Sequence, residues 1–306
     1  MLVGMKEMLH IAAPGKVNLA LWVGPVGADG MHPICSWMVT IDLCDDLALH
    51  RLPPGRLSRY AILWHQEALQ RTEIDWSIKK DLAVRAHLAL QSHVGRDLPI
   101  QMKLEKRIPV GGGMGGGSSN AAATLRGLNS LFDLGLSTAD LAGIGSGIGS
   151  DVPFFIDGGS ALVEGAGEKV TVQPTSSPIH LALFFPGVAC HTGKVYEQFD
   201  QMTASANSPQ QVYDMLESSL DPDVLFNDLG AAACCVAPVL NTHIEQIQAL
   251  AERSVCVSGS GSTLFVVCDD MMHAEALVQA VHKDSGLLGI ATSSIQEAPP
   301  LLVEGP

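Results

Sequence analysis

Hydrophobic and polar residues alternate along residues 16–23, a pattern typical of a β-strand. Val17 and Leu19 fall on one face of this strand, and Lys16 and Asn18 fall on the other. A lysine in this position can pair with a carboxylate or with a transferred phosphoryl group. A solvated lysine at a strand edge would explain Lys16 equally well.

Similar patterns predict the other elements of the chain. Strands are expected at 37–43, 100–105, 180–185 and 288–293, a hairpin at 159–172, and a strand–turn–strand unit at 255–268. Helices are expected at 82–93 after an N-cap at Asp81, and at 120–132, 138–143, 193–202, 208–218, 242–252 and 272–283. Residues 45–78 show no clear pattern and are expected to form edge strands and loops, and the tail at 298–306 is expected to fray.

These elements are predicted to form two domains. The 306 residues suffice for two domains or for one large one. A proline-punctuated stretch at 174–178 separates the patterns on its two sides. We therefore expect an N-terminal domain at 1–173 and a C-terminal domain at 174–306.

The segment at 109–125 carries the strongest chemical signal. It reads Pro-Val-Gly-Gly-Gly-Met-Gly-Gly-Gly-Ser-Ser-Asn-Ala-Ala-Ala-Thr-Leu, with two glycine triplets directly before a helix-forming run. Glycine loses the most backbone entropy on folding, so this density indicates a loop with positive φ angles that brings bare N–H groups close to a ligand. The N-terminus of the following helix attracts anions. The segment therefore predicts a phosphate-binding loop, and a flexible linker is the poorer explanation.

Two familiar glycine-rich motifs do not fit this segment. A Walker A loop would require Gly-Lys-Ser/Thr, and no lysine occurs in the loop. A Rossmann loop would require an acidic residue at a strand end about 20 residues later. Asp140 lies near that distance, but it falls in a polar helical stretch. The loop therefore belongs to another class of phosphate site.

The composition narrows the range of partners. The formal net charge is −14, which disfavours a nucleic-acid or anionic-membrane partner. The seven cysteines contain no C-x-x-C pair and mostly lie in apolar runs, as expected in a reducing compartment. No uninterrupted apolar stretch reaches 18 residues, and the first ten residues lack the apolar region of a signal peptide. We therefore expect a soluble, cytoplasmic protein.

Asp151 is the strongest candidate for a general base. It lies between Gly149-Ser150 and the apolar run at 152–156, where a carboxylate can be held ready to accept a hydroxyl proton. The alternative is a structural aspartate that caps a helix or a turn. A glycine-rich cradle, a base and the Lys16 cation would together suffice for phosphoryl transfer, which depends mainly on positioning and charge neutralisation.

Three segments, at 14–19, 109–124 and 257–265, resemble the motifs of the GHMP (galactokinase, homoserine, mevalonate, phosphomevalonate) kinase superfamily. More narrowly, the segments at 16–18, 28–32, 149–155 and 164–168 resemble the branch that acts on a cytidine diphosphate-linked methylerythritol. The segments occur in the family's order, and the resemblance extends from residue 14 to about residue 293.

The resemblance implies an α+β fold of the two-domain GHMP kinase type, with a mixed-sheet N-terminal domain, a ferredoxin-like C-terminal domain and a site between them. It also implies an enzyme that uses ATP and Mg²⁺ to phosphorylate the 2-hydroxyl of that substrate in the non-mevalonate isoprenoid pathway. Two alternatives remain. One is a GHMP kinase with a mevalonate-like or homoserine-like substrate, and the other is a catalytically silent nucleotide sensor on the same fold.

The resemblance assigns roles to individual residues. Asp151 is the expected base and Lys16 its charged partner, and both together disfavour the silent sensor. The expected ATP-binding residues are Pro109, Gly111, Gly112, Gly113, Gly115, Gly116, Gly117, Ser118, Ser119 and Asn120. The expected substrate-binding residues are Asn18, Met31, His32, Thr192 and Tyr196, with Met31 and His32 on one side of the cytosine and Tyr196 stacked on the other.

Two residues depart from the family pattern. Met31 stands where the family usually has tyrosine, although a thioether can still cover an aromatic face. Asp81 stands where the family has asparagine on the adenine side, and it offers no amide donor. The glycine-serine run at 258–262 is expected to help close the phosphate site. The four tryptophans are too dispersed along the chain to predict a stacking platform.

Overall fold

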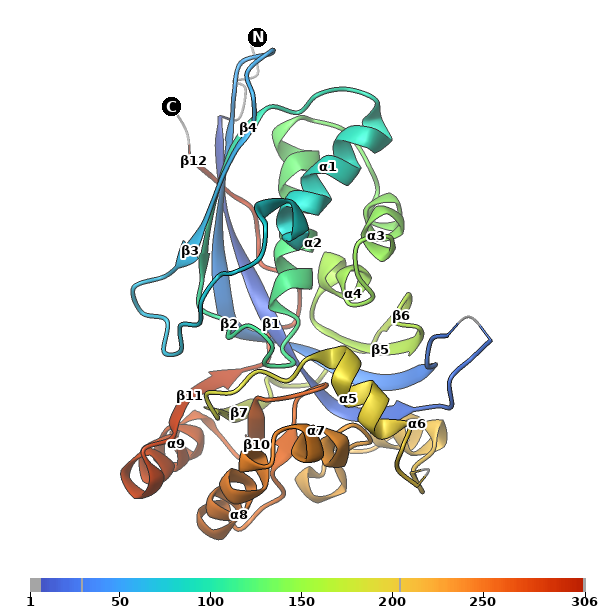
Figure 1. The fold of residues 1–306 in the computed structure, drawn as a ribbon, viewed down its shortest axis with the longest axis vertical. Coiled ribbons are helices and arrows are strands. Elements are labelled where there is room, and N and C mark those ends of the chain that lie inside the picture. Colours follow the sequence, from blue (N-terminus) through green and yellow to red (C-terminus); the bar gives the residue numbers. More distant parts are fainter. Residues whose placement is uncertain (1–6, 29, 204, 305–306) are drawn as a thin grey trace.

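The computed structural model describes residues 7–28, 30–203 and 205–304 of the chain. The architecture is α+β, as expected, and consists of a large mixed sheet and a smaller antiparallel sheet, each covered by helices (Figure 1).

The large sheet is built around two long antiparallel strands, β1 (Met8–Val23) and β2 (Ile34–Arg51). The second half of β2 pairs with β4 (Ile100–Lys106), and β4 pairs in parallel with the edge strand β3 (Arg59–Trp64). The length of β1 and β2 lets them reach from this sheet into the region of the smaller one.

Four shorter strands complete the large sheet. The hairpin of β5 (Ser160–Gly165) and β6 (Lys169–Val172) pairs with the first half of β2. Strand β12 (Leu302–Glu304) pairs with the start of β1, and β8 (Phe226–Asn227) pairs in parallel with its end. Parallel and antiparallel pairs therefore occur together, so the sheet is mixed.

Helices cover one face of the large sheet, as Figure 1 shows. They are η1 (Ile78–Lys80), α1 (Leu82–Val94), α2 (Gly116–Leu131), α3 (Thr138–Ser146) and α4 (Val152–Asp157). Leu90 of α1 and Leu125 of α2 are fully buried with Leu47 and Leu49 of β2. This core fixes α2, and with it the glycine loop, against the middle of the sheet.

The smaller sheet lies at the other end of the molecule in Figure 1. Its strand order is β11 (Leu288–Ser293), β7 (His180–Phe185), β10 (Leu264–Cys268) and β9 (Cys256–Val257), all antiparallel. The remaining helices are α5 (Thr192–Phe199), α6 (Pro209–Glu217), η2 (Pro222–Val224), α7 (Gly230–Val236), α8 (Val239–Ala251) and α9 (Met271–Ser285).

The two faces of the smaller sheet have different partners. Phe184 on one face packs into the core that includes residues of α8 and α9. Leu181 and Leu183 on the other face pack into a core with Val17 of β1 and Val39 of β2. Because alternate strand residues point to opposite faces, β7 joins its own helices to the large sheet. This shared core fixes the smaller sheet relative to the large sheet.

Most predicted elements occur within a few residues of their expected bounds, and the strands at 180–185 and 288–293 match them. Residues 45–51 correct the prediction of edge strands and loops, because they continue β2 in the interior of the sheet. The tail was expected to fray, but residues 302–304 form β12. Helix α2 begins at Gly116, inside the predicted loop, and α7 was not predicted at all.

The division into domains at 173/174 stays a prediction. Strands β8 and β12 follow residue 174 but pair with β1, so the large sheet contains strands from both sides of the division. Within the described residues, no helix is both long and apolar enough to cross a membrane. The expectation for the first ten residues falls largely on 1–6, which lie outside the described part of the chain.

Candidate active site

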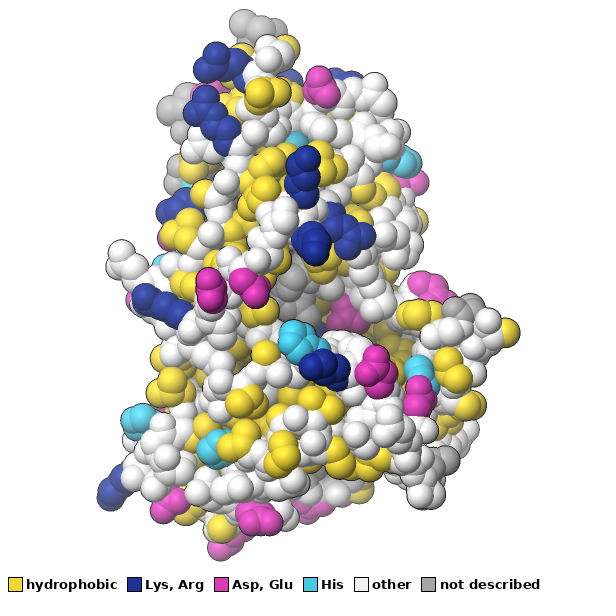
Figure 2. Space-filling view, in the orientation of Figure 1, with side chains coloured by type: hydrophobic (Ala, Val, Ile, Leu, Met, Phe, Trp, Pro, Cys, Tyr) yellow, Lys and Arg dark blue, Asp and Glu magenta, His cyan; other side chains and the backbone are white. Residues whose placement is uncertain are grey.

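A cavity of about 700 Å³ lies where the glycine loop, β1 and α5 meet. Figure 2 shows a hollow at mid-height on this face of the molecule. Every site residue predicted from the sequence lines the cavity except Ser119, which is buried in the first turn of α2. Residues from both predicted domains, 1–173 and 174–306, therefore line the same cavity.

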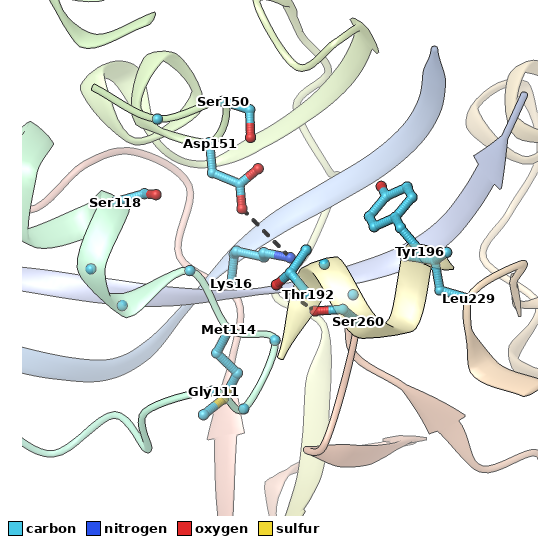
Figure 3. A pocket seen from close by; sticks show the side chains of 18 of the residues that line it. Lys16, Gly111, Met114, Ser118, Ser150, Asp151, Thr192, Tyr196, Leu229 and Ser260 are labelled. Atoms are coloured by element: carbon cyan, nitrogen blue, oxygen red, sulfur yellow. Dashed lines mark hydrogen bonds and ion pairs between the residues drawn. The ribbon is translucent and has the colours of Figure 1, made fainter. Parts of the chain in front are cut away.

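Lys16 and Asp151 face each other across this cavity (Figure 3). The distance from Lys16 Nζ to Asp151 Oδ2 is 3.9 Å, and Lys16 Nζ also donates to Asn18 Oδ1 at 2.5 Å. Lys16 is 4% exposed, and this burial lowers the pKa of its ammonium group, partly offset by the Asp151 charge. Lys16 is therefore not the solvated strand-edge residue of the alternative explanation.

Asp151 occupies the N-cap position of α4, yet its side chain caps no backbone amide. Its carboxylate is partly exposed to the cavity and directed at Lys16. On the other side of Lys16, Asn18 Nδ2 donates to Ser36 Oγ at 2.8 Å, and Ser36 Oγ donates to the carbonyl of Ala20 at 2.7 Å. This chain of bonds fixes the amide that holds the lysine.

The glycine loop is held by β1 and by the second glycine segment, at 258–262. The amide of Lys16 donates to the carbonyl of Met114 at 3.0 Å, and Ser258 Oγ donates to the carbonyl of Gly113 at 3.1 Å. Gly113 has a φ of 73°, and a Cβ atom there would lie 1.9 Å from the Ser258 carbonyl oxygen. A glycine at 113 therefore allows the two segments to pack closely against each other.

The second triplet begins α2. Gly115 has a φ of 66° and is the N-cap, and no side chain caps the helix there. The N-terminal amides of α2 and the Ser118 side chain thus border the cavity. Since a helix N-terminus carries partial positive charge, this end of the cavity is suited to phosphate groups.

The residues predicted to bind cytosine, Met31, His32 and Tyr196, lie together in another part of the cavity. His32 Nδ1 donates to the carbonyl of Gly24 at 2.8 Å, and its Nε2 lies 3.3 Å from Asp200 Oδ1. The His32 and Tyr196 rings are in contact, with centroids 5.1 Å apart. A base therefore cannot lie between these two rings in this conformation, and would have to lie beside them, where the half-exposed Met31 also lines the cavity.

Tyr196 and Thr192 both lie on α5. Burial raises the pKa of Tyr196 to about 12, and the Asp151 charge adds to the shift, so the phenol stays neutral. Thr192 Oγ1 and Ser260 Oγ are 3.0 Å apart, which connects α5 to the second glycine segment.

Two features of the site were not predicted. Trp76 lines the cavity, and its Nε1 donates to Asp81 Oδ2 at 3.1 Å, while Asp81 Oδ1 caps α1 through the Ala83 amide at 2.9 Å. No role was predicted for Trp76 from the sequence, and the structure places it alone among the tryptophans of the described residues at the cavity. The second feature is a buried ion pair between Asp45 and Lys106 at the base of the glycine loop.

The described residues contain no group of three or more His, Cys, Asp or Glu side chains placed to hold a metal ion. A Mg²⁺ ion that remains bound mainly to phosphates and water needs only one or two protein oxygens. The Ser118 hydroxyl, which lines the cavity in the first turn of α2, fits that requirement.

Comparison with known proteins gives two family matches. The profile of the GHMP kinases N terminal domain matches residues 81–159, and that of the GHMP kinases C terminal domain matches residues 204–286. The chain is 34% identical to a 4-diphosphocytidyl-2-C-methyl-D-erythritol kinase of Exiguobacterium sibiricum, covering 87% of this chain and 91% of the relative. It is also 34% identical to the kinase of that name from Geobacter sp. (strain M21), covering 94% and 100%.

Solved structures show the same relationship. A crystal structure of 4-(cytidine 5'-diphospho)-2C-methyl-D-erythritol kinase superposes with a TM-score of 0.75 at 28% identity, covering 93% of this chain and 98% of that one. Homoserine kinase from Cytophaga hutchinsonii superposes with a TM-score of 0.74 at 16% identity, covering 99% of both chains. The second match shows the fold alone.

Proposed function

This chain belongs to the GHMP kinases, and on that basis we propose that it is a 4-diphosphocytidyl-2-C-methyl-D-erythritol kinase. It transfers the γ-phosphoryl group of ATP to the 2-hydroxyl of that substrate, a step in the non-mevalonate route to isoprenoid precursors. The observation that carries the proposal is the Lys16–Asp151 pair, which faces the uncapped start of α2 across one cavity.

In this proposal Asp151 accepts the proton of the substrate hydroxyl. The hydroxyl is tertiary, hence crowded and weakly acidic, so a positioned base contributes strongly to the rate. Lys16 has three N–H donors. One donates a hydrogen bond to Asn18, and Asp151 interacts with the ammonium by charge at 3.9 Å. The remaining N–H groups can donate to the oxygens of the transferred phosphoryl group. The amides of α2 stabilise charge on the same oxygens.

ATP is proposed to lie with its phosphates on the glycine loop and its base toward Trp76. Near Trp76 the cavity is lined by Asp81, which accepts from the Trp76 indole, and by Leu82, which lies next to Gly117 in the first turn of α2. A Mg²⁺ ion would neutralise charge on the ATP phosphates, and Ser118 is the side chain proposed to hold it. The cytidine portion of the substrate is proposed to lie beside Tyr196 and Met31.

The proposal is tested by ADP release with Mg·ATP and a panel of alcohols. The panel contains the cytidylylated methylerythritol, methylerythritol phosphate without CMP, mevalonate and homoserine. We expect turnover with the cytidylylated substrate alone, because a cavity of about 700 Å³ has room for the nucleotide portion that the smaller alcohols lack. Turnover with mevalonate or homoserine instead would reassign the substrate, and ATP binding without any turnover would favour a nucleotide sensor.

A further inference from the structure

The carboxylate of Asp45 lies at the base of the glycine loop and is completely buried, with 0% of the residue exposed. It accepts four hydrogen bonds. The donors are Lys106 Nζ at 2.5 Å, the Arg107 amide at 2.6 Å, the Ile108 amide at 2.8 Å and Asn120 Nδ2 at 2.9 Å. Asp45 itself does not line the cavity, but Lys106 and Asn120 both do.

These donors come from both ends of the glycine loop. The amides of Arg107 and Ile108 lie where β4 ends and the loop begins, and Asn120 lies in α2 just after the loop. A single carboxylate therefore connects the two ends of the loop. Hydrogen bonds to an ionised acceptor are shorter and stronger than neutral ones, so the charge of Asp45 matters to this connection.

The Asp45 charge also determines how the Asn120 amide is oriented. An ionised carboxylate only accepts hydrogen bonds, so Asn120 must direct its NH₂ group at Asp45. Its Oδ1 is then buried, with no hydrogen-bond partner within the part of the chain that the structure describes. An unsatisfied buried acceptor beside the cavity is costly, and a bound ligand that donates a hydrogen bond would satisfy it.

We propose that Asp45 is the positioning residue of the glycine loop. Acting through the amides of 107 and 108 and through Asn120, it holds the loop in its ATP-binding shape before ATP arrives. A loop ordered in advance binds its ligand more tightly, because less conformational entropy is lost on binding. The identity of the ligand as ATP rests on the proposed function, whereas the ordering of the loop does not.

Asp45→Asn alone is a poor test, because it leaves the buried Lys106 ammonium without its counter-charge and can unfold the protein. The informative variant is the double substitution Asp45→Asn/Lys106→Met. Lys106→Met alone is its reference, because Lys106 also lines the cavity and because Asp45 keeps its other three hydrogen bonds in that variant. Asp46→Asn is the matched control, since Asp46 is the next residue on β2 and its side chain is 47% exposed. It pairs with the guanidinium of Arg107 (Nη1) at 2.8 Å, whereas Asp45 accepts from the Arg107 backbone amide.

Two measurements on these variants test the inference. Titration calorimetry gives the Kd of Mg·ATP and of the cytidylylated substrate, and hydrogen–deuterium exchange without nucleotide gives the protection of amides 107–120. Relative to Lys106→Met, the double variant is expected to bind ATP at least about tenfold more weakly, with substrate affinity unchanged and the loop amides exchanging faster. Asp46→Asn is expected to match the wild type in both.

Equal ATP affinity and equal exchange in the double variant and in Lys106→Met would overturn the inference. If the double variant or Lys106→Met does not fold, Asn120→Ala is the second test, because it keeps the ion pair and removes only the connection to α2. Amides 116–119 should then exchange faster, and unchanged protection would contradict the proposal. A wild-type protein that binds no ATP would refute the proposed function instead, while the exchange comparison would still decide the role of Asp45.

Discussion

At the scale of single residues, the site shows a conflict between stability and chemistry. Lys16 is buried, and its pKa is lowered because the low-polarity surroundings disfavour the ammonium form. In the unfolded chain the same group is fully charged at pH 7. Keeping Lys16 in the folded protein therefore costs stability, which is typical of a residue retained for function.

Lys16→Met tests this account of Lys16. The substitution removes a buried charge but keeps a side chain of similar length, so we expect the free energy of unfolding to stay within about 1 kcal/mol of the wild type or to increase. The turnover number should fall by orders of magnitude. Urea unfolding together with steady-state kinetics provides both values. A large loss of stability with retained turnover would make Lys16 a structural residue.

Trp76 gives a direct signal for nucleotide binding. Its indole lines the cavity and is held by Asp81, so a base placed beside it should change its fluorescence. We expect ATP to quench tryptophan emission in the wild type, and Trp76→Phe to remove that change. Trp64→Phe is the control, since Trp64 lies on β3 and donates to the Thr72 carbonyl at 2.6 Å, away from the cavity. Quenching that persists in Trp76→Phe would place the base elsewhere.

At the scale of elements, the two glycine segments act as one unit. The amide of Thr263 donates to the carbonyl of Gly112 at 3.1 Å, and the amide of Ser262 donates to the carbonyl of Gly111 at 3.3 Å. The turn between β9 and β10 is therefore hydrogen-bonded directly to the loop between β4 and α2. Substitutions in either segment should affect the other.

Gly113→Ala measures how strongly the two segments depend on each other. A Cβ atom at this positive φ would lie 1.9 Å from the Ser258 carbonyl oxygen, so the segments must separate. We expect a loss of stability of about 2 kcal/mol or more and much weaker ATP binding. Gly143→Ala is the control, because Gly143 lies within α3 and a Cβ there would meet nothing within 4 Å. Similar behaviour of the two variants would contradict the proposed packing.

The sequence allowed some elements to be predicted and concealed others, for physical reasons. Strand β7 was predictable because its continuous apolar run is buried on both faces. The second half of β2 was not, because the acidic pair Asp45–Asp46 looks like a loop unless Lys106 is known to neutralise Asp45. Strand β12 is only three residues long, so it depends on its pairing with β1, which a local pattern cannot reveal.

The candidate site was predicted more completely than the fold. Its residues belong to short glycine-rich and aspartate-containing motifs whose order along the chain carries the family resemblance. The contact between His32 and Tyr196, and the positions of Trp76 and Asp45, could not be predicted because they depend on how separate elements pack. Motifs thus indicated which residues gather at the cavity, and the packing of separate elements determines how these residues are arranged.

At the scale of the whole molecule, stability should depend on pH through His87. This residue is fully buried, with Nδ1 2.8 Å from the Tyr60 hydroxyl and Nε2 2.8 Å from the Leu98 carbonyl. Burial lowers its pKa, opposed in part by the hydrogen bond to Leu98. The folded state therefore favours the neutral ring, and the stability it contributes above the unfolded pKa of about 6.5 is lost as pH falls through the folded value.

Urea unfolding at pH 7.5, 6.5 and 5.5 tests this dependence. Below pH 6.5 the wild type should lose up to about 1.4 kcal/mol per pH unit through this group, and His87→Gln should lose correspondingly less. His93→Gln, at an exposed position of the same helix, is the control and should keep the wild-type slope. Identical slopes for wild type and His87→Gln would remove His87 from the acid response.

In the proposed reaction, Lys16, Asp151 and the glycine loop act together in one cavity, which α5 and the second glycine segment also line. The most direct test is ³¹P NMR of the reaction between Mg·ATP and the cytidylylated methylerythritol, with wild type and with Asp151→Asn. The wild type should form ADP and one new phosphomonoester on the tertiary carbon in equal amounts, and Asp151→Asn should bind ATP normally but form neither at a comparable rate. A phosphomonoester formed equally fast by Asp151→Asn, or ADP formed by the wild type with only inorganic phosphate, would contradict the account.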